Sequence, residues 1–182
     1  MKSIFKATKS VLESPLFNFN NHNLLKTLSK YEPREALMRY KGGGYLRLNS
    51  YLREDNGLPE NMIRLALGVD EGLKQLPVYT GDVFRTVAFS NNTQFENFIN
   101  EWKQGNTVIA KAYTSTSKGD IYNDLSNVNY GAIMKIHSLN GRDMMGIGLD
   151  ESEVLFPRNT KFKVNQTQRS GNILFLSANE VQ

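Results

Sequence analysis

The segment Leu149–Pro157, with the sequence LDESEVLFP, carries two glutamates two residues apart and then becomes a hydrophobic strand. Residues i and i+2 of a strand point to the same face, so Glu151 and Glu153 are expected to project together. Two negative charges held this close repel each other and resist burial, so an ordinary core strand has little reason to carry them. The pair therefore indicates either a solvated edge strand whose charges prevent aggregation, or a functional site that uses carboxylates.

The composition of the chain limits the classes of protein to which it can belong. Its 182 residues, 40% of them hydrophobic, suffice for one well-buried domain. We therefore expect a single domain over residues 1–182, with a helical part at 1–76 and a β-rich part at 77–182. The chain has no cysteine, which excludes a disulfide framework. Its two histidines, His22 and His137, are far apart, which argues against a metal site such as zinc.

The charge of the chain gives a weaker indication of its partners. A net charge of +4 suits a phosphate-bearing ligand or an acidic partner. The basic residues are scattered and form no stripe, which argues against nucleic acid as a partner. The N-terminal residues include no apolar run of secretory length, and no later segment reaches the length of a membrane span. We expect a chain that works in water and that either is exported without a cleaved signal peptide or belongs to a longer protein.

The first part of the chain has the spacing of amphipathic helices. Pro33 and Pro59 stand where proline is tolerated in a first helical turn, and the apolar residues after each of them fit one buried face. Three consecutive glycines, 42–44, are expected to end one helix. In the next helix Asn49 shares a face with Tyr45 and two leucines, where a buried amide would need hydrogen-bond partners.

The pattern changes to strands after Leu76. A glycine at position 81 indicates a bulge in the first strand, and one helix is expected among the strands, opened by a capping box at Thr93 and ending at Trp102. Because long helices do not alternate with the strands, the α+β class is expected rather than a doubly wound parallel sheet. The expected strands are at 77–87, 107–113, 130–137, 153–156, 160–164 and 172–176.

Three polar elements of this β-rich part stand at expected strand ends. They are Arg85, the hydroxyl run Thr114–Ser117 and the Glu-x-Glu pair. In this order they resemble the Arg/Ser/Glu class of mono-ADP-ribosyltransferases. That resemblance covers about residues 36–177 and implies a mixed or antiparallel β core of two packed sheets with an N-terminal helical region. A further set of residues is similar to a helix of the clostridial binary-toxin catalytic subunits and their single-domain relatives: Tyr40, Tyr45, Asn49 and Leu52-Arg53.

The resemblance implies that NAD is the substrate and gives roles to the residues at the strand ends. Glu153 would bind the ribose 2′-hydroxyl and stabilise the cation left when nicotinamide departs. Ser115 would hold Glu153 in place by a hydrogen bond, and Thr116 and Ser117 would support the turn. Arg85 would bind the phosphates of NAD, and the alternative for it is a salt bridge at a strand end.

Further contacts to NAD are expected from the helical part and from the residue after Arg85. Tyr40 and Tyr45 would cover the dinucleotide by stacking and Asn49 by hydrogen bonds, although core packing is an equal alternative for both tyrosines. Thr86 stands where the family often has a glycine or a second arginine. Its backbone would contact the nicotinamide amide.

The loop at 141–150 corresponds to the loop that selects the target in this family. Met144, Met145 and Ile147 would either grip a protein there or pack inward. Glu151 stands where the arginine-specific members have glutamate. It would orient the guanidinium of an acceptor arginine and accept its proton.

These residues lead to one functional prediction. The chain is expected to be an NAD-dependent mono-ADP-ribosyltransferase that modifies an arginine of a target protein and slowly hydrolyses NAD, without a metal. As a bacterial toxin or effector it would be secreted or delivered, with a delivery or translocation component as a further partner, and would act in the cytosol of the target cell. Two alternatives stay open: a different acceptor, including nucleic acid, or a catalytically silent NAD-binding interaction module.

Overall fold

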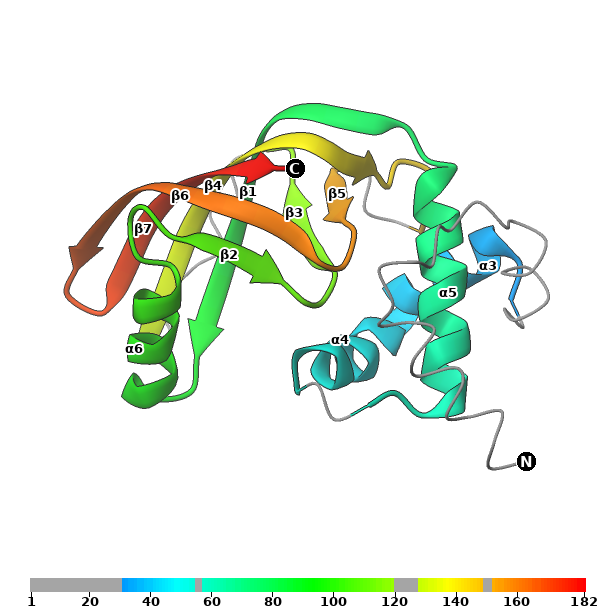
Figure 1. The fold of residues 1–182 in the computed structure, drawn as a ribbon, viewed down its shortest axis with the longest axis horizontal. Helices are drawn as coiled ribbons and strands as arrows, with labels where there is room; N and C mark the ends of the chain where they lie inside the picture. The colour runs from blue at the N-terminus through cyan, green and yellow to red at the C-terminus, as the bar shows by residue number, and fades with distance from the viewer. Residues whose placement is uncertain (1–30, 55–56, 120–127, 149–151) are drawn as a thin grey trace. The chain divides into compact units, whose positions relative to one another are not determined.

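The chain is seen in a computed structural model that describes residues 31–54, 57–119, 128–148 and 152–182. It divides into two compact units, Met1–Leu73 and Lys74–Gln182. The first unit holds helices, and the second holds all the described strands together with one helix (Figure 1). The expected α+β class, with helices preceding a mixed sheet, is confirmed.

The described part of the first unit is helical throughout most of its length. Pro33 occupies the first turn of its helix, as expected. The three glycines also break the helix as expected, because Gly43 has a φ of 113°, which favours glycine, and Tyr45 starts a new helix. The elements are α3 (Pro33–Arg39), the π-helical turn η1 (Tyr40–Gly44), α4 (Tyr45–Glu54) and α5 (Glu60–Lys74).

A glycine allows α3 and α5 to pack closely. Ala36, Leu37 and Tyr40, which have the expected apolar spacing, are all buried. Gly72 of α5 lies so close to α3 that a Cβ atom on it would be 2.7 Å from Leu37 Cγ. The absence of a side chain at Gly72 therefore allows α5 to lie this close to the helix that leads to Tyr40.

The second unit is organised around one seven-stranded sheet, so the expected division of the β core into two packed sheets is wrong for the described strands. Its strands are β1 (Val78–Phe89), β2 (Thr107–Ala110), β3 (Thr114–Ser117), β4 (Tyr130–Asp143), β5 (Glu153–Phe156), β6 (Thr160–Ser170) and β7 (Ile173–Val181). The order is β1-β3-β5-β4-β7-β6-β2, and β1 also pairs with β4. Only the β4–β7 pair is parallel among the described strands. In Figure 1 the short strands β3 and β5 lie side by side and run in opposite directions.

Several strands are longer than the sequence pattern indicates. β4, β6 and β7 all continue past their expected ends. The bulge expected at Gly81 is present, with a φ of 145° at that glycine, and an unexpected one follows Val164 in β6. The additional residues of β7, 177–181, pair with β6, a contact between distant segments that local pattern does not reveal.

The strand expected at 107–113 is shorter, and the hydroxyl run that follows it is a separate strand. β2 ends at Ala110, whose carbonyl accepts a hydrogen bond from Asn159 N at 2.7 Å. Thr114–Ser117 then forms β3, which pairs with β5 and with β1. The expectation that the hydroxyl run ends the preceding strand is therefore wrong.

Helix α6 (Asn92–Glu101) begins earlier than the capping box at Thr93 predicts. Asn91 is the cap, and its side chain accepts a hydrogen bond from Gln94 N at 3.0 Å. The sequence offers two cap residues, each followed three residues later by a glutamine or glutamate. The structure uses the first of them.

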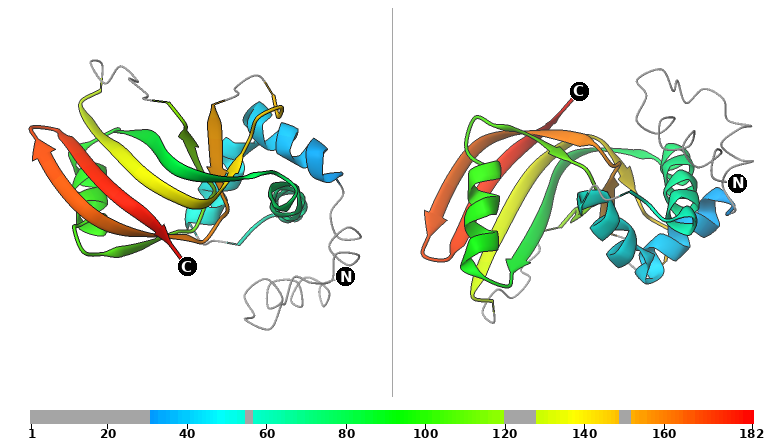
Figure 2. Two further views of the ribbon diagram at one scale, coloured as in Figure 1. Left: turned by 90° about the horizontal axis from the view of Figure 1, so that it is seen from above. Right: turned by 60° about the horizontal axis from the view of Figure 1, so that its bottom comes forward.

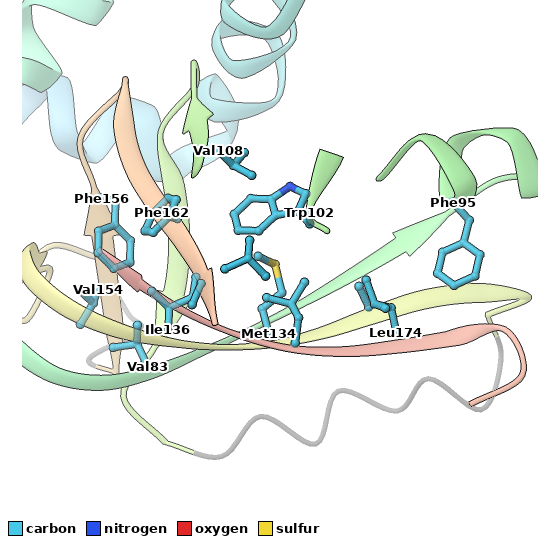
Figure 3. Close-up of a cluster of buried hydrophobic side chains, with 14 residues drawn as sticks. Val83, Phe95, Trp102, Val108, Met134, Ile136, Val154, Phe156, Phe162 and Leu174 are labelled. Atoms are coloured by element: carbon cyan, nitrogen blue, oxygen red, sulfur yellow. The ribbon is translucent and has the colours of Figure 1, made fainter. Parts of the chain in front are cut away.

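The hydrophobic core of this unit lies between α6 and one face of the sheet (Figure 2). Trp102, at the end of α6, points toward Phe162 of β6, and the ring of Phe156 lies beside that of Phe162 with centroids 5.1 Å apart (Figure 3). Val154 and Phe156 of β5 are fully buried in this cluster. Core packing therefore fixes the strand that begins with Glu153.

Strand β4 is irregular at Leu139 and Asn140, opposite the bulge of β1. Glu180 of β7 accepts hydrogen bonds from the backbone N–H groups of both residues, each at 2.7 Å. These bonds satisfy a carboxylate that is only 6% exposed. Beyond the irregularity β4 continues to Asp143 and pairs with β5.

We predict that Gly141→Ala destabilises this junction. A Cβ atom at Gly141 would lie 2.6 Å from both Ser138 Oγ and Val154 Cγ1, so the strands would have to shift. Overpacking of this kind costs about 1–3 kcal/mol, which should lower the melting temperature by roughly 2–10 °C. The control is Gly119→Ala, because Gly119 has open space around it. Equal melting temperatures for the two variants would contradict the prediction.

Candidate active site

Glu153 is the first residue of β5, and its side chain is largely buried. β5 lies between β3 and β4, so the interpretation of Glu153 as part of a solvated edge strand is wrong. A buried carboxylate needs hydrogen-bond partners. Ser115 Oγ donates to Glu153 Oε1 at 2.7 Å, which is the contact expected from the sequence.

Two further hydroxyl groups of β3 form hydrogen bonds to β5 and to the residue before it. Thr116 Oγ1 is buried and donates to the carbonyl of Val154 at 2.8 Å. Ser117 Oγ donates to Ser152 Oγ at 3.1 Å. Thr116 and Ser117 therefore stabilise a strand pair, and their expected part in a turn is corrected. Their contacts fix β3, which carries Ser115, against β5.

Arg85 approaches the same serine from β1. It lies inside β1, which continues to Phe89, so its expected place at the strand end is wrong. Its Nη1 donates to the carbonyl of Ser115 at 2.6 Å. The structure thus brings Arg85, Ser115 and Glu153 together, although they are far apart in the sequence. Thr86 follows in β1, and alternation along the strand turns its side chain away from that of Arg85.

Ser115 forms hydrogen bonds to a cation, Arg85, and to an anion, Glu153. Ser115 accepts from Arg85 through its carbonyl and donates to Glu153 through its hydroxyl. These two hydrogen bonds hold each charged group in one orientation. A fixed orientation is needed where a guanidinium is to bind phosphate and a carboxylate is to stabilise positive charge. We refer to Arg85, Ser115 and Glu153 as the Arg-Ser-Glu group.

The predicted NAD contacts of the helical part form a group of their own in the first unit. Asn49 Nδ2 donates to the hydroxyl of Tyr40 at 3.0 Å, and both side chains are buried. The rings of Tyr40 and Tyr45 have centroids 6.1 Å apart, and Tyr45 is exposed. Core packing thus accounts for Tyr40, whereas the exposed ring of Tyr45 is able to contact a ligand.

Glu151 lies outside the residues that the structure describes, as do Leu149 and Asp150. The preceding part of the loop is described. Met144 and Ile147 are buried, whereas Met145 is 65% exposed. Of the two expectations for these residues, inward packing holds for Met144 and Ile147. Met145 faces solvent and remains available to contact a target protein.

Sequence reasoning missed an ion pair beside this loop. Lys118 Nζ lies 2.9 Å from Asp143 Oδ1, and both side chains are mostly buried. Lys118 directly follows the hydroxyl run, and Asp143 ends β4. No spacing rule connects residues this far apart in the sequence, so no signal in the chain could have identified the pair.

Two carboxylates elsewhere in the second unit have shifted pKa values. Hydrogen bonds from Lys135 and His137 hold the pKa of Asp82 below its usual range, in an exposed cluster on β1 and β4. Burial raises the pKa of Glu101.

Within the described ranges there is no cluster of acidic, histidine or cysteine side chains that could hold a metal ion. The helices of the same ranges include none long and apolar enough to cross a membrane.

Comparison with known sequences identifies relatives of the chain. The family model described as ADP-ribosyltransferase exoenzyme matches residues 16–177. A Mycobacterium avium (strain 104) protein, Mav, named as an inferred NAD(+)–arginine ADP-ribosyltransferase, is 31% identical over 71% of this chain. The NAD(+)–protein-arginine ADP-ribosyltransferases Tre1 of Serratia proteamaculans and Pseudomonas putida are 29% and 30% identical over 83% and 71% of it. The chain spans only 15%, 32% and 25% of the lengths of these three proteins.

Solved structures share the fold. Exoenzyme S from Pseudomonas aeruginosa superimposes with a TM-score of 0.68 at 18% identity, over 85% of this chain and 76% of that one. The Vis toxin from Vibrio splendidus gives a TM-score of 0.63 at 21% identity, over 82% and 73%. The match of the family model over residues 16–177, which is most of the chain, shows that the chain belongs to the ADP-ribosyltransferase exoenzyme family.

Proposed function

We propose that the chain is an NAD-dependent mono-ADP-ribosyltransferase that transfers ADP-ribose to an arginine of a target protein. The observation that carries the proposal is the largely buried Glu153 carboxylate, which accepts a hydrogen bond from Ser115 Oγ at 2.7 Å. The carbonyl of the same serine accepts a hydrogen bond from Arg85. Family membership and the names of the relatives support the same activity.

The reaction breaks the bond between nicotinamide and the ribose of NAD. Nicotinamide leaves with the bonding electron pair, and the ribose carbon becomes an oxocarbenium-like cation, as in glycoside hydrolysis. Glu153 would bind the ribose 2′-hydroxyl and stabilise this cation, because its fixed negative charge faces the positive charge that develops. Ser115 keeps the carboxylate oriented. An arginine nitrogen of the target then bonds to the ribose carbon and loses its proton.

The phosphates of NAD would bind to Arg85. Its guanidinium offers five donors in a planar fork, so the bond to Ser115 O is compatible with a phosphate contact. The exposed ring of Tyr45 would stack on the dinucleotide, while Tyr40 and Asn49 would support that ring from the interior of the first unit. Thr86 would contribute only its backbone.

We predict that Arg85→Lys weakens NAD binding. An ammonium cannot form the paired hydrogen bonds of a guanidinium, so the loss should be roughly 1–3 kcal/mol, or about 5- to 150-fold in the dissociation constant. Calorimetric titration with NAD measures it. Arg169→Lys is the matched control, because Arg169 pairs with Glu96 on an exposed part of the second unit. A dissociation constant unchanged by Arg85→Lys would return Arg85 to a purely structural role.

The acceptor is proposed to be arginine, with Glu151 as the residue that prepares it. A guanidinium is protonated at physiological pH and attacks poorly until a carboxylate orients it and takes a proton. Three relatives carry arginine in their names. Vis, which shares the fold, has been solved in complex with agmatine, a small guanidine.

We propose further that both compact units form one catalytic domain over residues 1–182, because the family model spans both. Its role would be that of a bacterial toxin or effector delivered to the cytosol of a target cell. A delivery or translocation component would then be a second partner, beside the target protein that bears the acceptor arginine.

The experiment that tests the proposed function uses NAD labelled in its adenosine part. The chain is incubated with this NAD and a cell lysate, and labelled peptides are analysed by mass spectrometry. We expect arginine side chains that each carry a single ADP-ribose. Label on nucleic acid or on another type of residue would overturn the arginine assignment, and the absence of both label and nicotinamide release would overturn the activity.

A further inference from the structure

The segment between β4 and β5 is tied at both of its described ends by the Lys118–Asp143 ion pair. Lys118 Nζ donates to Asp143 Oδ1 and Oδ2 at 2.9 and 3.1 Å. Both side chains are mostly shielded from solvent, with 24% and 22% exposure. The ring of Tyr79 lies 6.0 Å from the same ammonium and adds a cation–π contact.

Each member of the pair also holds the backbone of the segment. Asp143 Oδ1 accepts from Met145 N at 3.0 Å, at the point where the segment leaves β4. The backbone N–H of Lys118 donates to the carbonyl of Ser152 at 2.9 Å, at the point where the segment joins β5. One ion pair therefore connects the first turn after β4 to the residue before Glu153.

Two other features make the first turn rigid. Met144 and Ile147 are buried, and Ile147 N donates to the carbonyl of Met144 at 2.9 Å. Met144 N in turn donates to the carbonyl of Glu153 at 3.0 Å. The turn is thus anchored beside the proposed catalytic carboxylate even without the ion pair. What the ion pair adds is a link between this turn and Ser152, next to Glu151 in the sequence.

We propose that Lys118 and Asp143 are positioning residues for the acceptor: their ion pair holds the turn after β4 and Ser152 beside Glu153, where the acceptor guanidinium has to meet the ribosyl cation. This inference rests on the proposed function. Glu153 is held independently by Ser115 Oγ and by the core packing of β5, so cleavage of NAD depends little on the pair. Transfer to an acceptor depends on it strongly.

The pair is poorly suited to a purely stabilising role. Both charges are largely buried, so the cost of removing them from water offsets much of their attraction, and such a pair is weak evidence for a stabilising role. Misplacement of a reacting group by about 1 Å, however, is able to cost roughly a hundredfold in rate. Loss of the pair should therefore change the ratio of transfer to NAD hydrolysis. A purely stabilising ion pair would leave that ratio unchanged.

The test compares transfer to agmatine with hydrolysis of NAD in variants of the full chain. Lys118→Met removes the charge but retains a side chain that packs on Tyr79. Lys118→Arg retains the ion pair and is the rescue variant. Glu96→Gln is the matched control, because it removes an ion pair with Arg169 elsewhere in the same unit. Melting temperatures are recorded for every variant.

We expect Lys118→Met to lower kcat/KM for transfer to agmatine by about tenfold or more, while NAD hydrolysis stays within about threefold of the unchanged chain. Lys118→Arg and Glu96→Gln should retain both activities. An equal loss of both activities in Lys118→Met, or a loss of neither, would overturn the inference. If the unchanged chain neither transfers nor hydrolyses, the proposed function itself fails, which separates the two outcomes.

Discussion

Replacement of Glu153 by alanine is expected to lower both ADP-ribose transfer and NAD hydrolysis by at least about a hundredfold. The carboxylate is the negative charge that faces the ribosyl cation, and loss of one preorganised electrostatic group commonly costs about 10²–10³ in rate. Both activities pass through the same cation, so both should fall together. The affinity for NAD should stay within about tenfold, because the interaction is strongest in the transition state.

The substitution is informative only if the chain still folds. Glu153→Gln keeps the size of the side chain and an oxygen that accepts from Ser115 Oγ, so it removes the charge alone. It should be nearly as inactive as the alanine variant. Glu180→Gln serves as the control, since Glu180 is an equally buried carboxylate that binds backbone N–H groups. Wild-type turnover in Glu153→Gln, measured as nicotinamide release, would refute the assignment.

Replacement of Glu151 by glutamine is expected to separate the two activities. The amide keeps the size and hydrogen bonding of the side chain but cannot take a proton from the acceptor guanidinium. Transfer to arginine should therefore fall by roughly the 10²–10⁴ that a general base contributes. Water needs less activation against so reactive a cation, so NAD hydrolysis should persist at a substantial fraction of the wild-type rate. Parallel assays of agmatine modification and nicotinamide release measure the two.

Other results with Glu151→Gln would carry different meanings. Unchanged transfer and hydrolysis would make Glu151 a surface carboxylate with no part in the reaction. An equal loss of both activities would mean that Glu151 shapes the NAD pocket, and the assignment of arginine as acceptor would lose its main support.

The features that depend on a short stretch of sequence could be predicted from that stretch alone. β5 has the predicted bounds, and alternation and glycine placement predicted the bulge at Gly81 and the helix break at Gly43. The Ser115–Glu153 hydrogen bond was expected from the family resemblance rather than from spacing. These predictions succeeded because each depends on a short stretch of chain or on a motif whose partners the family defines.

Features that depend on contacts between distant strands could not be predicted in the same way. The hydroxyl run reads as the end of the strand before it, and only its pairing with β5 and β1 makes it a separate strand. Arg85 seemed to end a strand because the extension of β1 to Phe89 depends on its pairing with β4. The Lys118–Asp143 pair joins two strand ends that no sequence period relates.

The most direct test of the central claim is incubation of the purified chain with NAD and agmatine, with the products separated by chromatography and identified by mass spectrometry. We expect nicotinamide release together with a covalent product of one ADP-ribose and one agmatine, with the formation of both at least about a hundredfold slower in Glu153→Gln. Intact NAD, or release of nicotinamide with free ADP-ribose as the only other product, would contradict the claim that this chain is an arginine ADP-ribosyltransferase.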